Sequence, residues 1–129
     1  MSEPVWIRKE ALLALHARSL ALHGGAEGVR DESLLESALM RPVNRFQYEG
    51  TVDPCVLAAT YAVAMSANHP FVDGNKRAAL TCLLLFLAEN GLRLRADRVE
   101  TTRVMVSVAA GDIDIDALAA WISANSSPA

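Results

Sequence analysis

The sequence predicts an all-α protein: a helical bundle with a buried central helix, in which residues 1–129 form one domain. Leu and Ala recur at helical spacing along most of the chain. Asp, Pro and Gly stand where successive helices begin and end. The stretch LTCLLLFLA is apolar nearly all round, as in a helix at the centre of a bundle. With 129 residues and 52% hydrophobic content, the chain can bury a core without disulfides or a structural metal.

The first two helices are predicted from their apolar spacing and their ends. The first runs from about Arg8 to His23 and stops at Gly24-Gly25. Its apolar positions are Leu12, Leu15 and Leu22. The second begins after Asp31, whose side chain can cap free backbone N–H groups, and closes at Pro42.

The third and fourth helices flank a short loop. Asp53-Pro54 predicts a capped start for the third helix, which ends near His69 because Pro70 disfavours helical geometry in the residue before it. One face of this helix is expected to carry Val56, Thr60, Val63 and Ala67. The fourth helix is expected over about residues 75–90, with Gly91 as its stop, and we expect it to be the core helix.

The last part of the chain is predicted to hold a strand and two helices. Leu92 and Leu94 alternate with arginines, which indicates a short strand that pairs with Val5 to Ile7. A fifth helix is expected from Asp97 to Gly111, with Val99, Thr102, Val106 and Ala109 as its apolar-face positions. A sixth is expected from about Asp114 through Ile122. The final SSPA is expected to be a loose tail.

The composition argues against nucleic-acid and membrane partners. Lys+Arg 12 against Asp+Glu 15 gives a net charge of -3, which opposes wholesale contact with phosphate backbones, and 5% aromatic residues leave few rings for stacking bases. The longest apolar stretch is far below the ~20 residues that a membrane span needs, and the first residues do not resemble an export signal. Cys55 and Cys82 show no CxxC spacing and are expected to be buried free thiols. We therefore expect a cytoplasmic protein with no direct nucleic-acid or membrane partner.

The segment HPFVDGNKRAA, residues 69–79, carries charge that packing alone does not explain. If Asn75 caps the fourth helix, Lys76 and Arg77 occupy its first turn, where the helix dipole makes each cation cost about 0.3 to 1 kcal/mol. A bound anion would turn this unfavourable contribution of the two cations into a favourable one. Free N–H groups at a helix N-terminus, the close approach that Gly74 allows and two adjacent cations together predict a phosphate site.

Asp73 and His69 extend this prediction to a nucleotide. Asp73 repels a phosphate unless a divalent cation lies between them, and a carboxylate oxygen is the ligand that Mg²⁺ prefers. His69 stands at a helix end just before the anion site, and imidazole can take a proton from a hydroxyl near neutral pH. The sequence therefore places a candidate base, metal ligand and phosphate site in one loop.

Each of these residues also has an ordinary structural interpretation. An isolated histidine at a helix end commonly bonds a nearby carbonyl, Asp73-Gly74-Asn75 is a plain turn and cap sequence, and the two cations can simply be solvated. Phe71 is expected to be a hydrophobic plug that holds the loop to the core. His16 and His23 are expected to be structural or surface residues. The combination, rather than any single residue, favours a functional site.

HPFVDGNKR resembles the signature of the Fic/Doc family: a histidine followed at fixed offsets by phenylalanine, an acidic residue, Gly-Asn and an arginine. Further similarity lies in LHARSLALHGG, GVRDESLLESALMRP, the NG after the fourth helix and GDIDIDALAAW. The resemblance covers essentially the whole chain. The small size and these flanking segments are similar to the Doc (death-on-curing) toxin branch rather than to larger Fic enzymes.

The resemblance implies an all-helical Fic fold with ATP and Mg²⁺ as cosubstrates. His69 then corresponds to the general base and Asp73 to the Mg²⁺ ligand. The anion-binding loop corresponds to Gly74, Asn75, Lys76 and Arg77. For this branch the implied reaction is transfer of the γ-phosphate of ATP to a threonine of elongation factor Tu, which halts translation. A Phd-type antitoxin is the implied partner.

Three departures from the family pattern bear on the reaction. Ala78 stands where many Doc-like sequences carry threonine, so the position still holds a small residue. Leu80 replaces a second arginine of AMP-transferring relatives, and Lys76 replaces their glycine; both differences favour a kinase. The alternatives are AMP transfer by the same loop and a non-catalytic, antitoxin-binding corepressor. The intact histidine, aspartate and basic pair argue against the non-catalytic alternative.

Overall fold

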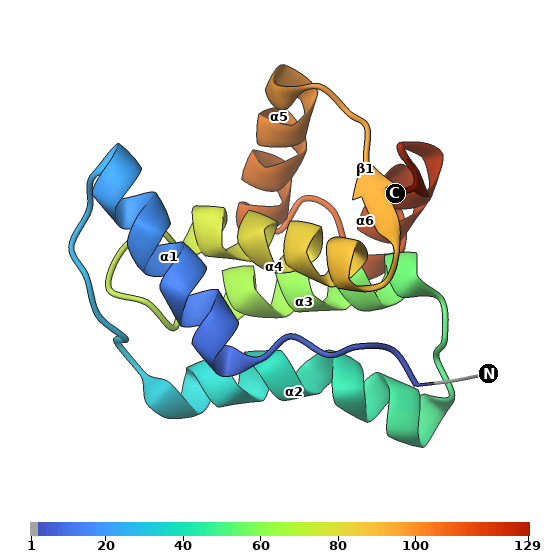
Figure 1. The fold of residues 1–129 in the computed structure, drawn as a ribbon, viewed down its shortest axis with the longest axis horizontal. Helices are drawn as coiled ribbons and strands as arrows, with labels where there is room; N and C mark the ends of the chain where they lie inside the picture. Colours follow the sequence, from blue (N-terminus) through green and yellow to red (C-terminus); the bar gives the residue numbers. More distant parts are fainter. Residues whose placement is uncertain (1–2) are drawn as a thin grey trace.

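The computed structural model describes residues 3–129, and within this range the chain forms six helices and one two-stranded sheet (Figure 1). The helices are α1 (Lys9–His23), α2 (Glu32–Glu49), α3 (Pro54–Asn68), α4 (Asn75–Glu89), α5 (Arg98–Ala109) and α6 (Ile115–Ala124). The strands are β1 (Leu92–Leu94) and β2 (Ser126–Pro128). The all-α prediction is confirmed. None of the helices in residues 3–129 is long and apolar enough to cross a membrane.

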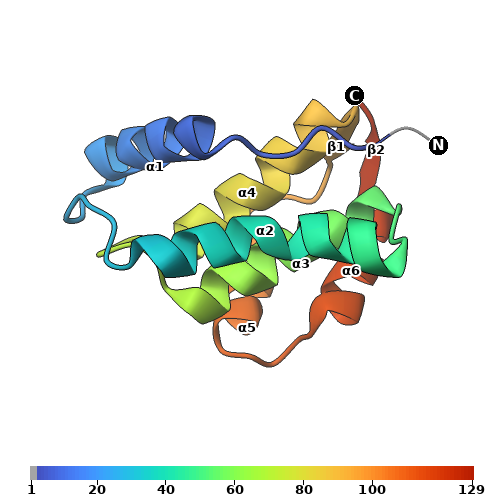
Figure 2. The same cartoon turned by 90° about the horizontal axis from the view of Figure 1, so that it is seen from below.

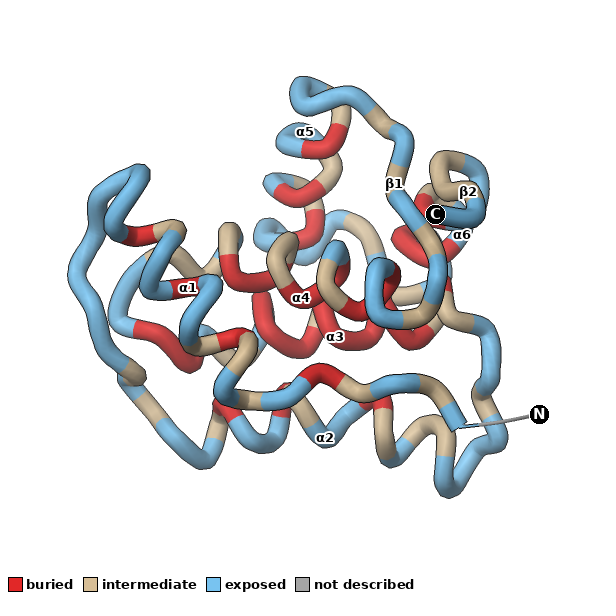
Figure 3. Tube along the Cα trace, in the orientation of Figure 1, coloured by how far each residue is buried: buried red, intermediate tan, exposed pale blue. Residues whose placement is uncertain are grey.

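The centre of the bundle is α3, which packs against α2, α4 and α6. Its buried side chains come from nearly every direction around the helix, whereas α4 leaves Leu84 41% exposed (Figure 3). The prediction that α4 is the core helix is therefore only partly right, because α3 is the more enclosed of the two. Alanine and other small residues on α3 allow its neighbours to approach on several sides. Tyr61 and Phe86 fill the space between α3 and α4, with ring centroids 5.3 Å apart.

Aspartate caps begin four of the helices in the described part of the chain. Asp31, Asp53, Asp97 and Asp114 accept hydrogen bonds from backbone N–H groups in the first turns of α2, α3, α5 and α6 respectively. An aspartate side chain at this position replaces a missing intrahelical partner. These starts were predicted from the sequence, and the structure confirms them.

Pro42 does not close the second helix, which corrects the sequence prediction. It lies inside α2, is buried, and the helix continues to Glu49 before Gly50 ends it in a left-handed conformation. Proline removes one helical hydrogen bond at this point. Packing beyond the proline offsets that loss, since Phe46 meets Trp6 edge-on with ring centroids 5.6 Å apart.

The predicted strand exists, but its predicted partner is wrong. β1 pairs antiparallel with β2, so the SSPA tail is ordered rather than loose (Figure 2). Residues Val5 to Ile7 run nearby without joining the sheet. There the Asn90 side chain accepts from Val5 N–H at 2.8 Å and donates to Val5 C=O at 3.0 Å. One amide side chain thus imitates a strand partner.

Three helices depart from the buried faces that the sequence predicts. On α1 the buried residues are Leu12, His16 and Leu20, while Leu15 and Leu22 are exposed. On α5 the core takes Thr101, Met105 and Val108, and Val99, Thr102, Val106 and Ala109 face outward. On α3, Ala67 is exposed although it shares the expected face with Thr60. Cys55 and Cys82 are free and buried, as predicted.

Candidate active site

The loop between α3 and α4 is held by the loop between α1 and α2, at the end of the bundle opposite the sheet (Figures 1 and 2). Val29 and Phe71 form an isolated antiparallel bridge, and Val72 N–H donates to Gly28 C=O at 3.0 Å. Arg30 N–H donates to Pro70 C=O at 2.7 Å. Phe71 is 2% exposed and anchors the loop in the core, as expected. The segment therefore has a defined backbone course rather than that of a free surface loop.

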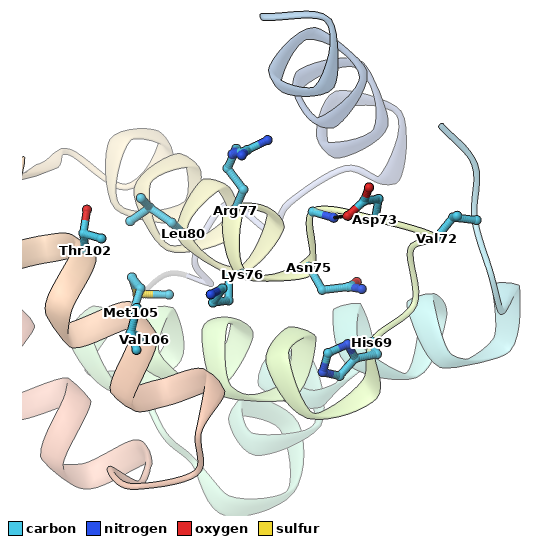
Figure 4. Close-up of a pocket in the computed structure, with 11 residues that line it drawn as sticks. His69, Val72, Asp73, Asn75, Lys76, Arg77, Leu80, Thr102, Met105 and Val106 are labelled. Carbon is cyan, nitrogen blue, oxygen red and sulfur yellow. Dashed lines mark hydrogen bonds between the residues drawn. The ribbon is translucent and has the colours of Figure 1, made fainter. Parts of the chain in front are cut away.

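His69 caps the C-terminus of α3 in a left-handed conformation with φ 47° and ψ 55°. Among residues 3–129 it is the one non-glycine residue with positive φ. Such backbone strain persists where surrounding contacts fix the conformation, and it is common at functional sites. The exposed side chain of His69 points into the space between α4 and α5 (Figure 4).

Gly74, not Asn75, is the N-cap of α4, which corrects the expected cap. Its φ of 75° is left-handed, a conformation that glycine adopts without a steric cost. Asn75 is the first helical residue, and its side chain turns back on the loop. Its Oδ1 accepts from Phe71 N–H at 3.0 Å and its Nδ2 donates to Phe71 C=O at 3.0 Å. Asn75 therefore shapes the loop through its side chain.

The N-terminus of α4 is open. The first backbone hydrogen bond of this helix runs from Ala78 N–H to Gly74 C=O, so the three preceding N–H groups lie ahead of the helical ladder. The glycine cap offers them no side chain, unlike the aspartates that begin four other described helices. The first turn holds Lys76 and Arg77 and no acidic residue, and neither cation is in an ion pair with another described residue. This end of the helix therefore presents concentrated positive potential.

Asp73 borders this positive end. Its carboxylate accepts from Gly74 N–H at 3.0 Å and from Ala26 N–H at 3.2 Å, so two loops orient it. Within residues 3–129, no group of three His, Cys, Asp or Glu side chains is arranged to hold a metal ion. One exposed carboxylate fits Mg²⁺ that arrives with phosphate oxygens and water, which is the usual mode for nucleotide-bound magnesium.

A cavity of about 590 Å³ lies where the loop, α4 and α5 meet (Figure 4). This volume falls within the range of small-molecule sites. The lining residues are His69, Val72, Asp73, Gly74, Asn75, Lys76, Arg77, Leu80, Thr102, Met105 and Val106. All the candidate residues named from the sequence thus border one cavity.

The cavity has a polar end and an apolar wall. Lys76 and Arg77 leave α4 in different directions, with Arg77 pointing away from His69 (Figure 4). Leu80, on α4, and Met105 and Val106, on α5, form the apolar wall. The contribution of α5 could not be predicted from the sequence, because no local pattern marks ordinary residues that only the fold brings to the cavity.

Two residues outside the signature segment also hold the loop: Arg30, for which no role was predicted, and His16, which is structural as expected. The Arg30 guanidinium donates to backbone carbonyls at the end of α3. His16 is 3% exposed and stacks on Phe71, with ring centroids 3.9 Å apart, whereas His23 is exposed. Burial lowers the pKa of His16, and the hydrogen bond to the Asp73 carbonyl opposes this shift. The one available signal was helical spacing, since His16 lies four residues from both Leu12 and Leu20.

Comparison with known proteins gives a matching family and similar relatives. The model of the Fic/DOC family matches residues 6–87. The chain is 37% identical over 113 residues to the protein kinase doc of Escherichia phage P1, an alignment that covers 88% of this chain and 89% of that relative. It is 38% identical over 115 residues to the toxin Doc of Mycolicibacterium smegmatis, covering 84% of this chain and 85% of that relative. The family match spans the candidate loop, and the protein belongs to the Fic/Doc family.

Proposed function

We propose that the protein is a toxin that transfers the γ-phosphate of ATP to a threonine hydroxyl of elongation factor Tu in the cytoplasm, and so blocks translation. The observation that carries this proposal is the cavity shared by His69, Asp73 and the open N-terminus of α4. The relatives named protein kinase doc and toxin Doc support the class of reaction and the biological role.

The chemistry follows from the placement of the polar groups. His69 takes the proton of the attacking hydroxyl. The hydroxyl oxygen forms a bond to the γ-phosphorus as the bond to the bridging oxygen breaks, which releases ADP. Backbone N–H groups of α4 and the Lys76 ammonium stabilise the negative charge on the transferred group. Asp73 is the residue that would hold Mg²⁺, which supplies further neutralisation of phosphate charge.

Leu80 supports γ-phosphate transfer over AMP transfer. It borders the cavity one turn beyond Arg77, at the position where AMP-transferring relatives carry a second arginine. An apolar side chain there cannot hold the outer phosphates. Of the two cations in the first turn of α4, Lys76 is then the one that does not point away from His69 (Figure 4). We propose that ATP presents its γ-phosphate at this end.

A toxin requires a partner that silences it, and we propose an antitoxin of the Phd type. The similarity to toxin Doc supports this assignment. The partner is expected to be a protein produced with the toxin, and co-expression is expected to relieve growth arrest. The whole chain, residues 1–129, is proposed to act as one domain in this complex.

Labelled ATP tests the proposal. Purified elongation factor Tu is incubated with the protein and ATP labelled separately at the γ or the α position. We expect label from the γ position only, a mass increase of one phosphate on a threonine, and loss of transfer in His69→Ala. His23→Ala, which changes an exposed histidine on α1, is the matched control and should transfer normally. Label from the α position, or an adduct with the mass of AMP, contradicts the kinase assignment.

A further inference from the structure

His16 lies on α1, outside the signature segment, yet three residues of the candidate loop meet its ring. The imidazole lies against the Phe71 ring, tilted from it by 32°. Its Nε2 lies 3.0 Å from the Asp73 carbonyl oxygen, and since a carbonyl oxygen only accepts, Nε2 carries the hydrogen. A Cβ added at Gly74 would lie 2.9 Å from His16 Cε1, so glycine is required for this approach.

The hydrogen bond from His16 fixes one peptide plane. The Asp73 carbonyl and the Gly74 N–H belong to the same planar, trans peptide unit and point in opposite directions. His16 holds the carbonyl, and on the other side Gly74 N–H donates to the Asp73 carboxylate at 3.0 Å. Rotation of this peptide would break both contacts together. The orientation of the carboxylate and the entry into α4 therefore depend on a residue 57 positions earlier.

We propose that His16 is a positioning residue: it holds the Phe71–Gly74 backbone in the conformation that sets Asp73 and the open N-terminus of α4 against the cavity. This inference rests on the proposed function for its activity readout only, because the contacts themselves join residues of this chain. His16 borders the loop from the α1 side and is not among the residues that line the cavity, so it acts through the loop rather than on substrate.

The two ring nitrogens of His16 are not equivalent, so two variants can separate the contact made by Nε2 from the polarity of the side chain. Nδ1 is buried and has no hydrogen-bond partner among the described residues, while Nε2 makes the contact to the loop. Glutamine can place its amide nitrogen near the position of Nε2, whereas the shorter asparagine places it near that of Nδ1. His16→Gln should therefore retain the contact and His16→Asn should lose it, at similar polarity. His23→Asn, at an exposed site on the same helix, is the matched control.

Amide hydrogen exchange on the unliganded protein is the first measurement. In His16→Asn we expect exchange of the Val72 and Gly74 amides to rise about tenfold, as loss of one hydrogen bond predicts, while amides in the centre of α3 keep their protection. His16→Gln and His23→Asn should match the wild type. Equal loop exchange in His16→Asn and wild type overturns the proposal. Parallel loss of protection in α3 and the loop, in both His16 variants, also overturns it, because that result means a general packing role.

Binding of inorganic phosphate and the transfer rate are the second measurement. Phosphate should perturb the amides of Asn75 to Arg77 in the wild type, and its binding to His16→Asn should be several-fold weaker. In the transfer reaction, His16→Asn should change kcat more than it changes KM, with kcat lowered. His16→Gln should restore both. If the wild type neither binds inorganic phosphate nor transfers the γ-phosphate of ATP, the proposed function is refuted. The comparison of amide hydrogen exchange between the variants still decides the role of His16 in that case. Unchanged phosphate binding and kcat in His16→Asn, in an active wild type, refutes the positioning role.

Discussion

Arg30 closes the end of α3 at His69. Its Nε donates to the His69 carbonyl oxygen at 2.8 Å, and its Nη2 donates to the Asn68 carbonyl oxygen at 3.0 Å. A cation at this end complements the negative pole of the helix dipole and satisfies carbonyls that have no helical partner. Because His69 is left-handed at the same point, the guanidinium holds the candidate base in a conformation that a non-glycine residue rarely adopts.

Arg30→Ala is therefore expected to impair the proposed reaction more than it impairs folding. The free energy of unfolding should fall by about 1 to 2 kcal/mol, the scale of hydrogen bonds to a charged group at an exposed site. Misplacement of the base should lower kcat by about ten- to a hundredfold. Chemical denaturation and single-turnover transfer measure the two effects. Arg18→Ala on α1 is the control, and equal activity in the two variants contradicts this role of Arg30.

His69 provides a test that separates backbone strain from chemistry. His69→Ala and His69→Gly both remove the imidazole, and both should lower the transfer rate by about 10² to 10⁴, the usual effect of losing a general base. Glycine relieves the left-handed strain and alanine does not, so His69→Gly should be more stable than His69→Ala by about 1 kcal/mol. Thermal melts compare the pair. Activity within a few-fold of wild type in either variant would sink the assignment of His69 as the base.

Lys76 tests the anion site without reference to catalysis. The cation stands at the positive end of α4, so Lys76→Ala should leave the stability of the unliganded protein unchanged or raise it by about 0.3 to 1 kcal/mol. Affinity for inorganic phosphate should fall in the same variant. Arg77→Ala is expected to behave in the same way. Calorimetry and thermal melts at low salt give both quantities, with Arg93→Ala on β1 as a remote control. A marked loss of stability in both Lys76→Ala and Arg77→Ala indicates that the cations serve packing instead.

Structural features that depend on neighbouring residues could be predicted from the sequence, whereas features that depend on distant contacts could not. Asp31 and Asp97 mark helix starts because a cap bonds an N–H three residues later. The predicted helix end at Pro42 was wrong, because the contacts that stabilise α2 beyond it involve Trp6, far away in the chain. The partner of β1 lies more than thirty residues later, and nothing in SSP indicates a strand.

The residues of the candidate site also divide into those marked by local sequence and those that only distant contacts bring together. His69, Asp73 and Lys76 lie in one segment and could be named together from residue chemistry. His16 and Thr102 could not be assigned to the site, because they belong to other helices, and the helical spacing of His16 indicates only burial. The packing of α1 against α4 and the loop brings His16 to the site, and the packing of α5 against α3 and α4 brings Thr102 there.

The pH dependence of thiol labelling tests whether the two cysteines are buried in the core. Burial raises the pKa of the Cys82 thiol to about 12 and also raises the pKa of Cys55. The thiolate is the reactive form, so at pH 8 both groups are almost entirely unreactive thiols. A disulfide reagent should label the native protein slowly, with a rate that still increases above pH 9, and label both thiols at once after denaturation. Fast labelling of the native protein at pH 8 contradicts the burial of these side chains.

Leu80 tests how the proposed kinase holds ATP in the cavity. The residue lines the cavity one turn after Arg77, so Leu80→Arg places a guanidinium where outer phosphates can reach it. We expect Leu80→Arg to bind ADP and ATP several-fold more tightly and to lower the ratio of γ- to α-phosphate transfer, because the outer phosphates are drawn away from His69. Leu84→Arg, one turn further along α4 at an exposed site outside the cavity, is the matched control and should change neither quantity. Isothermal titration and paired α- and γ-label assays measure both effects. If Leu80→Arg and Leu84→Arg behave alike, Leu80 does not face the bound nucleotide, and its replacement of the second arginine does not explain a preference for the γ-phosphate.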